Sequence, residues 1–185
     1  MTQKRTALCA TGLYTAQMLH QHPEPRPGES APFHFESRWL LDAPAQAIWD
    51  AFADPAAWPR WWPGMERTVA PASGTGDGSG ARVDLTVRSP LLPGPPAGAL
   101  RLSLRIVEAA PPRRARVAVR GDLRGHGLWL AHEAGGITRV DIVWCVVTAR
   151  PLLRLLRPLS GLSHRTVMRG GARGLARELS TRTRR

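Results

Sequence analysis

The chain has 185 residues, of which 43% are hydrophobic and 22% charged, a balance typical of one globular domain with a substantial core. No apolar run reaches the roughly 18–20 residues of a membrane span. The net charge of +12 comes almost entirely from arginine, and the basic residues are not interleaved with aromatic residues that stack on bases, so the sequence predicts no specific nucleic-acid partner.

Residues 1–32 have the composition of a poorly ordered tail. Ala7 to Met18 weakly resembles a signal peptide, but polar residues interrupt its apolar core, and residues 22–32 are rich in proline. Cys9 and Cys145 are too few for a disulfide framework and are expected to be free thiols. We therefore expect a cytoplasmic protein with an ordered domain over residues 33–181 and a short basic tail at 182–185.

The ordered domain is expected to begin with a strand over residues 33–41, where aromatic and apolar residues alternate with polar ones. Asp42 then offers a helix cap, and Pro44 suits a first helical turn. The apolar spacing predicts a short helix around residues 47–52. Asp54 and Pro55 should end it and start a second short helix.

Three tryptophans gather in this second helix, and they are Trp58, Trp61 and Trp62. Core packing against a sheet is the expected role of such large side chains. A box that stacks on a ligand is the alternative interpretation.

Five further strands are predicted from alternating or continuously apolar segments separated by Gly, Ser and Pro turns. They cover residues 81–88, 100–106, 115–120, 123–133 and 137–148. The last two are apolar on both faces, so the pattern does not decide which face turns inward. The connection from Ser89 to Gly98 carries leucines and prolines and is too apolar for an ordinary solvated loop.

The C-terminal part of the chain predicts a long helix over residues 162–180, separated by Pro158 and Gly161 from a connector of leucines and arginines that starts at Pro151. One face of this helix carries the side chains that must pack on the sheet. They are His164, Met168, Gly171, Leu175 and Leu179. Its glycines either permit a close approach of the sheet or leave room for a ligand.

Four stretches resemble the START-like superfamily, also called SRPBCC or polyketide cyclase/dehydrase-like. They run from Asp42 to Gly64, Gly121 to Trp129, Thr138 to Trp144 and Ser163 to Leu175, and relatives often carry Asn where this chain has Ser163. The resemblance spans about residues 33–180. It implies an α+β helix-grip fold, in which a curved antiparallel sheet of six or seven strands wraps around the long C-terminal helix, with two short helices after the first strand.

The resemblance also implies an apolar cavity between sheet and helix, closed by the Ser89–Gly98 loop as a gate. Family members bind sterols, lipids, plant hormones or aromatic polyketides there. The residues expected to line such a cavity are Trp62, Leu85, Leu91, Leu92, Leu102, Leu104, Val117, Trp129, Trp144, His164, Met168, Gly171 and Leu175.

His164 is the one candidate for acid–base catalysis, because imidazole titrates near neutral pH and the helical spacing directs it toward the cavity. The alternative is a histidine that hydrogen-bonds a neighbouring loop. His126 and His132 lie about 20 Å apart along a strand and cannot share a metal ion. Asp141 is expected to pair with an arginine.

The chain contains no Cys-x-x-Cys pair, phosphate-binding glycine loop or Gly-x-Ser-x-Gly elbow, so no metal or cofactor is predicted. Arg165, Arg169, Arg173 and Arg177 are expected on a solvated helix face, with weak contact to anionic membranes as the alternative. Three functions follow: binding of a small hydrophobic ligand, cyclase-like catalysis through His164, and lipid transfer at anionic surfaces. The sequence gives no oligomeric state.

Overall fold

The computed structural model describes residues 22–88 and 99–183. It contains seven strands in one antiparallel sheet. These are β1 (Phe33–Leu41), β2 (Met65–Ala72), β3 (Arg82–Arg88), β4 (Ala99–Ala110), β5 (Arg114–Gly121), β6 (Arg124–Ala134) and β7 (Ile137–Val147). The helices are α2 (Ala45–Ala53), the 3-10 turn η1 (Pro55–Ala57), α3 (Trp58–Trp61), α4 (Pro151–Leu155) and α5 (Arg157–Thr183).

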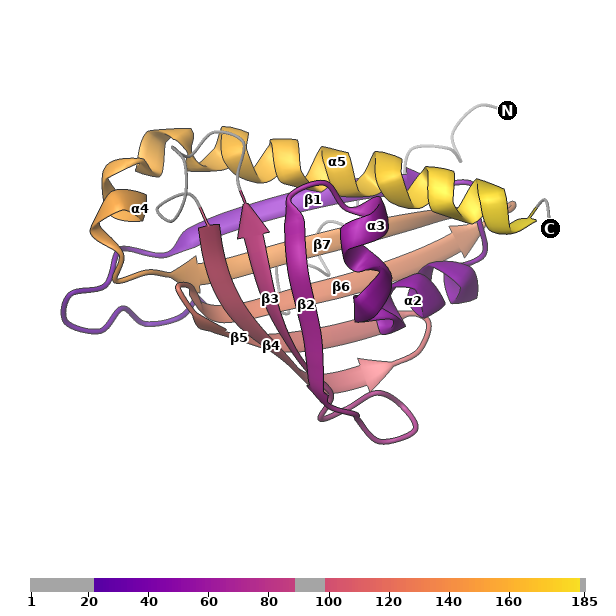
Figure 1. Ribbon diagram of the computed structural model, residues 1–185, viewed down its shortest axis with the longest axis horizontal. Coiled ribbons are helices and arrows are strands. Elements are labelled where there is room, and N and C mark those ends of the chain that lie inside the picture. Colours follow the sequence, from indigo (N-terminus) through magenta and orange to yellow (C-terminus); the bar gives the residue numbers. More distant parts are fainter. Residues whose placement is uncertain (1–21, 89–98, 184–185) are drawn as a thin grey trace, which may run out of the picture.

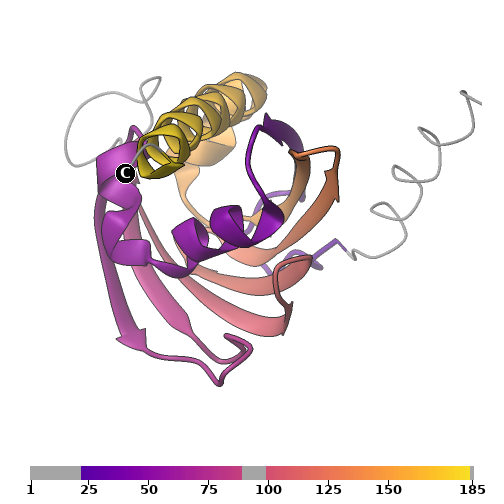
Figure 2. The same ribbon diagram turned by 90° about the vertical axis from the view of Figure 1, so that its right-hand side faces the viewer.

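The sheet has the strand order β1-β7-β6-β5-β4-β3-β2, so every strand except β1 neighbours the strand that follows it in the chain. It curls strongly, and α5 lies along its open side (Figures 1 and 2). The helices α2 and α3 close one end of the curl, while α4 lies at the other end of α5. This is the expected helix-grip architecture.

The strand β2 is the strand that the sequence pattern did not predict, and the predicted connector from Pro151 contains the short helix α4. The pairing of β2 with β3 shifts register between Met65 and Arg67 and again between Val69 and Ala72. Each shift reverses the alternation of inward and outward side chains. The period of two on which strand prediction depends is therefore absent from this segment.

The predicted starts of two helices, α2 and α5, are wrong. The residue that caps α2 is Pro44 rather than Asp42, and it makes no side-chain cap bond. The Glu133 carboxylate, at the end of β6, instead accepts the Ala45 N–H at 2.7 Å. A partner that distant in sequence fills the same need for an acceptor at a helix start.

The long helix starts earlier than predicted, at Arg157, and Leu156 separates it from α4. Pro158 lies in the first turn of α5, where its missing N–H leaves no hydrogen bond unmade. Gly161 is also accommodated within the helix. Neither residue is the helix breaker that the sequence suggested.

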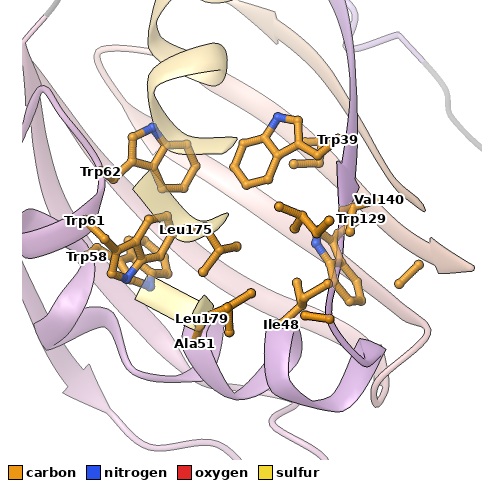
Figure 3. Close-up of a cluster of buried hydrophobic side chains, with 14 of the residues drawn as sticks. Trp39, Ile48, Ala51, Trp58, Trp61, Trp62, Trp129, Val140, Leu175 and Leu179 are labelled. Atoms are coloured by element: carbon orange, nitrogen blue, oxygen red, sulfur yellow. The ribbon is translucent and has the colours of Figure 1, made fainter. Parts of the chain in front are cut away.

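The main core lies at the end of the curl where α2 and α3 meet the C-terminal half of α5. Figure 3 shows Leu175 and Leu179 of α5 between two groups of aromatic side chains. Trp58, Trp61 and Trp62 lie on one side of them, and Trp39 and Trp129 on the other; all seven side chains are at most 9% exposed.

The segment that precedes β1 is held against the sheet, although it has no helix or strand of its own. The backbone of Ser30 donates to the Thr148 carbonyl at 2.8 Å, and the Ser30 side chain is buried. The Arg124 guanidinium binds the carboxylate of Glu29 with its Nε at 2.9 Å. The proline-rich composition of this segment, which predicted a poorly ordered tail, gives no indication of such contacts.

Candidate ligand-binding cavity

A cavity of about 630 Å³ lies between the concave face of the sheet and α5. Its wall is overwhelmingly apolar. Among the predicted residues, the wall contains Trp62, Leu85, Leu102, Leu104, Val117, Trp129, Trp144, His164 and Met168. Leu91, Leu92 and the rest of the predicted gate lie outside the described residues.

Alternate residues of each strand form most of the cavity wall, and Leu128 on β6 is an exception. The structure shows which set faces inward on the two strands that are apolar on both faces. On β6 the inward residues include Gly127 and Trp129, and on β7 they include Trp144 and Val146. His126 and Cys145 consequently belong to the convex face, because neighbouring residues of a strand point to opposite sides.

The two halves of α5 meet different surroundings. The inward residues of its first half, from Leu159 to Met168, belong to the cavity wall. Gly171 and Leu175, which were also predicted to line the cavity, do not. Leu175 is fully buried in the tryptophan core instead, and the cavity ends before this point of the helix.

Trp62 closes the cavity at that point. A Cβ added to Gly171 would lie 2.6 Å from the Trp62 indole, and one added to Gly174 would lie 1.6 Å from the Trp61 carbonyl oxygen. The Trp62 Nε1–H donates to the Val167 carbonyl of α5 at 3.1 Å. These two glycines therefore permit close packing of α3 on α5, and leave no space for a ligand there.

The tryptophan cluster packs in the core as predicted, and two of its members also line the cavity. Trp61 is core alone, whereas Trp58 and Trp62 are buried residues that also contribute to the cavity wall. Trp61 and Trp62 stack with their ring centroids 5.3 Å apart. The rings thus form a rigid floor, since stacked and edge-on aromatic contacts fix ring orientation.

His164 lines the cavity from the first half of α5 and has partners on β1. Its ring stacks on Phe35 at 4.5 Å between centroids, and its Nε2 forms a 3.1 Å hydrogen bond with the Ser37 hydroxyl. Burial lowers the pKa of His164 from 6.5 to about 4. The imidazole is therefore neutral at physiological pH.

Two other ionisable side chains belong to the described wall, and both have partners outside it. Asp77 accepts a hydrogen bond from the Ser79 N–H in the β2–β3 turn at 2.9 Å. Arg82 binds Asp84 on its own strand at 3.1 Å. Both lie at the exposed end near the turn, so the interior suits an uncharged apolar molecule.

Sequence reasoning missed much of the wall, including Phe33 and Phe35 of β1 and Trp49 and Phe52 of α2. It also missed two parts that lie outside the predicted strands and helices. One is the β2–β3 turn from Ser73 to Gly78, and the other is formed by Leu153, Leu156 and Leu159 at the α4–α5 junction. The spacing of three residues between these leucines is a helical signal that could have identified them. The turn carries no comparable signal, because its place depends on the curl of the sheet.

Asp141 pairs with arginines, as predicted. Its carboxylate oxygens lie 2.7 Å from Arg38 Nε and 2.9 Å from Arg139 Nε. Arg165, Arg169, Arg173 and Arg177 are all exposed on α5. Among the described residues, none of the helices combines the length and hydropathy that a membrane crossing requires.

A curled antiparallel sheet closed by a long helix over an apolar cavity defines the helix-grip class. The chain belongs to the family described as polyketide cyclase/dehydrase and lipid transport, whose sequence profile matches residues 32–183. In a sequence search, no curated protein matches significantly.

Solved structures of the same fold share little sequence with this chain. The Zhui aromatase/cyclase of Streptomyces sp. R1128 is 16% identical, with a TM-score of 0.65 over 83% of this chain and 96% of that one. A protein of Thermus thermophilus is 16% identical, with a TM-score of 0.64 over 80% and 98%. A START superfamily protein of Mycobacterium smegmatis is 15% identical, with a TM-score of 0.60 over 80% and 97%.

Proposed function

We propose that the protein binds a small hydrophobic molecule, such as a lipid or an aromatic polyketide, in the cavity beneath the first half of α5. The observation that carries this proposal is the cavity itself, about 630 Å³ of space with a nearly uncharged wall. Protein interiors ordinarily close such voids, and ligand pockets typically measure about 300–1,000 Å³. A cytoplasmic location for the protein agrees with the free thiol of Cys145.

The shape of the wall favours a flat or elongated ligand. Trp58, Trp62, Trp129 and Trp144 present ring surfaces from different elements, which suits stacking on an aromatic molecule. His164 and Ser163 offer polar atoms on the α5 side. A molecule with few polar groups on an apolar body would match both the aromatic surfaces and the polar atoms of α5.

The test uses a substitution that fills the cavity and leaves the fold intact. Leu102→Trp places an indole in the wall, and Val107→Trp on the same strand is the matched control, because Val107 is 52% exposed and outside the wall. Protein purified from its own host is examined by native mass spectrometry. The probes oleic acid and a tricyclic anthraquinone are then titrated, with quenching of tryptophan fluorescence as the readout.

A co-purified small molecule, or saturable quenching that Leu102→Trp weakens at least tenfold and Val107→Trp leaves unchanged, supports the proposal. An apo mass together with quenching by neither probe, or with equal quenching in both variants, contradicts it. Five of the seven tryptophans line the cavity, so a change in their emission reports a ligand bound there.

The second candidate function is a cyclase-like reaction on the bound molecule, with His164 transferring a proton. Its place in the wall and its hydrogen bond to Ser37 favour this candidate. A neutral imidazole can accept a proton from an enolisable ligand or donate its N–H to a carbonyl. His164→Gln should then abolish turnover of a polyketide probe while its affinity changes less than threefold; an unchanged rate would exclude His164.

The third candidate, lipid transfer at anionic membranes, rests on the surface around the α4–α5 junction. Leu155, Leu159 and Leu162 are 77%, 47% and 50% exposed, and Leu159 also belongs to the cavity wall. Exposed leucines beside arginines suit insertion into an anionic interface. Vesicles with roughly 30 mol% phosphatidylserine, an anionic lipid of the cytoplasmic leaflet, should bind the protein at low salt and release it at high salt.

Two variants test whether membrane contact requires both apolar surface and charge. Leu155→Ser/Leu162→Ser removes exposed apolar surface, whereas Arg169→Gln/Arg173→Gln removes charge on the exposed face of α5. Both variants should lose vesicle binding if the patch inserts at a charged interface. Absence of binding at low salt by the unmodified protein would exclude this candidate.

A further inference from the structure

A cluster of metal-ligand residues lies on the convex face, away from the cavity. His34 on β1 and Cys145 on β7 are register partners, and neither lines the cavity, whereas their strand neighbours Phe35 and Trp144 do. The His34 Nδ1 and the Cys145 Sγ are 3.1 Å apart. The pairing of the edge strand β1 with β7 therefore places an imidazole nitrogen beside a sulfur atom.

The segment before β1 adds a third donor. His22 lies edge-on to His34, with ring centroids 5.4 Å apart and an interplanar angle of 80°. One donor atom from each of His22, His34 and Cys145 lies within 4.8 Å of the other two. Ligands of a tetrahedral Zn²⁺ at about 2.0–2.3 Å are separated by roughly 3.3–3.7 Å, so the three donor atoms lie close to the spacing that a bound ion requires.

A carboxylate orients the central ligand. The other ring nitrogen of His34, Nε2, is 2.9 Å from Glu36 Oε1. Metal-binding histidines usually donate their second N–H to a carboxylate or carbonyl, which fixes the tautomer and makes the coordinating nitrogen more basic. With Glu36 on Nε2, the lone pair of Nδ1 faces Cys145, which is the arrangement that a metal ligand needs.

We propose that His22, His34 and Cys145 bind a single zinc ion, with Glu36 as the carboxylate that orients His34 and a water molecule as the fourth ligand. One thiolate and two imidazoles are a ligand set suited to Zn²⁺. On binding, the Cys145 thiol proton leaves to solvent, and no electron is transferred. The ion joins the N-terminal segment to β1 and β7.

A Cys–His–Glu arrangement could instead suggest a catalytic nucleophile. Cys145 has no exposed surface, and burial together with the charge of Glu36 raises the pKa of its thiol to about 11. Reactive cysteines have the opposite properties, namely partial exposure and a lowered pKa. A bound cation supplies the positive charge that a thiolate at this position lacks.

The experiment uses untagged full-length protein with Cys9→Ser, so that a thiolate signal reports Cys145 alone. After treatment with a chelator, the protein is titrated with Co²⁺, whose thiolate complex gives an intense near-ultraviolet charge-transfer band; Zn²⁺ is then added as competitor. We expect one equivalent of Co²⁺ to give the band and Zn²⁺ to remove it. Removing a ligand by His22→Gln or His34→Gln should weaken binding more than 100-fold, and Glu36→Gln about 10–100-fold.

The control is His132→Gln, an exposed histidine on β6, which should bind Co²⁺ like the parent. His22→Gln keeps the test valid if Cys145→Ser fails to fold, because His22 is exposed and outside the sheet. The proposal is overturned by absence of the band, by a band that persists in a folded Cys145→Ser variant, or by parent-like affinity in His22→Gln. The cavity plays no part in this readout, so the result is independent of ligand binding.

Discussion

The two halves of α5 pack on the same sheet with opposite outcomes. The C-terminal half has Leu175 and Leu179 in a solid tryptophan core, with Gly171 and Gly174 in close contact with Trp62 and Trp61. The N-terminal half lies over a cavity of about 630 Å³. Helix and sheet are continuous across both halves, so the difference arises from α3, whose tryptophans pack against the C-terminal half.

This difference assigns stability of the fold to one half of α5 and the proposed ligand binding to the other. Large rings and small helix residues let α3 contact α5 closely, and this contact stabilises the fold. Where α3 does not pack against α5, the side chains of the helix and the sheet leave space that a ligand can occupy. The C-terminal half of α5, here called the packed half, therefore holds the helix in position. The N-terminal half, here called the open half, is held by it above the sheet and forms one wall of the cavity.

The largest predicted effect is on the packed half. Trp61→Ala removes a side chain that is 4% exposed and stacked on Trp62, and should lower the free energy of unfolding by about 3–5 kcal/mol. Urea denaturation followed by circular dichroism measures it. A loss below about 1 kcal/mol would mean that Trp61 does not anchor α5.

Gly174→Ala tests the close approach of α3 to α5. The new methyl group would meet the Trp61 carbonyl oxygen, a backbone atom, so we expect a loss of about 1–3 kcal/mol from overpacking. Gly161→Ala in the open half is the matched control, because no atom beyond its chain neighbours and its own helix backbone lies within 4 Å of its Cβ position. The control should gain up to about 1 kcal/mol through helix propensity; equal changes would contradict the comparison.

The open half should respond to pH through His164. Its folded pKa of about 4 lies below the ordinary 6.5, so between these values the unfolded chain binds a proton that the folded chain does not. The contribution of His164 to the free energy of unfolding is therefore complete above pH 6.5 and is lost as the pH falls toward 4. The loss is about 2 kcal/mol between pH 7 and pH 5.

The measurement is urea denaturation at several pH values between 7 and 4. His164→Gln should remove this part of the slope. His132→Gln changes an exposed histidine and should preserve it. A slope that is unaffected by His164→Gln would show that His164 is solvated in the folded protein.

The smallest stability effect is expected in the cavity wall. Leu104→Ala truncates a half-buried side chain that already faces open space, and should cost about 1 kcal/mol, well below the 2–5 kcal/mol of a fully packed leucine. Thermal denaturation without added ligand measures it. A loss as large as that of Leu175→Ala, whose side chain is fully buried, would mean that the cavity is filled in solution.

Much of the architecture could be predicted from local pattern. The alternation in β1, β3, β4 and β5, the turn residues between them and the inward spacing of His164, Met168 and Leu175 all have the period of the element that forms. Such periods depend only on backbone geometry, so a sequence displays them without tertiary information. The resemblance in the Asp42–Gly64 segment adds the helix-grip topology.

Other features depend on contacts between distant segments. Glu133 supplies the acceptor at the start of α2, where local sequence pointed to Asp42. The bulges of β2 hide its alternation, and only its pairing with β3 identifies it as a strand. His22 meets Cys145 because the N-terminal segment folds back on the convex face.

The sequence by itself therefore determined the class of fold and the face of α5 that meets the sheet, because helix and strand periods are local properties of the chain. Only the tertiary structure decided where the cavity ends. That boundary lies between Met168 and Gly171, where the Trp62 ring packs against the helix. Its position depends on how closely two separate helices approach, a distance that no periodic pattern encodes.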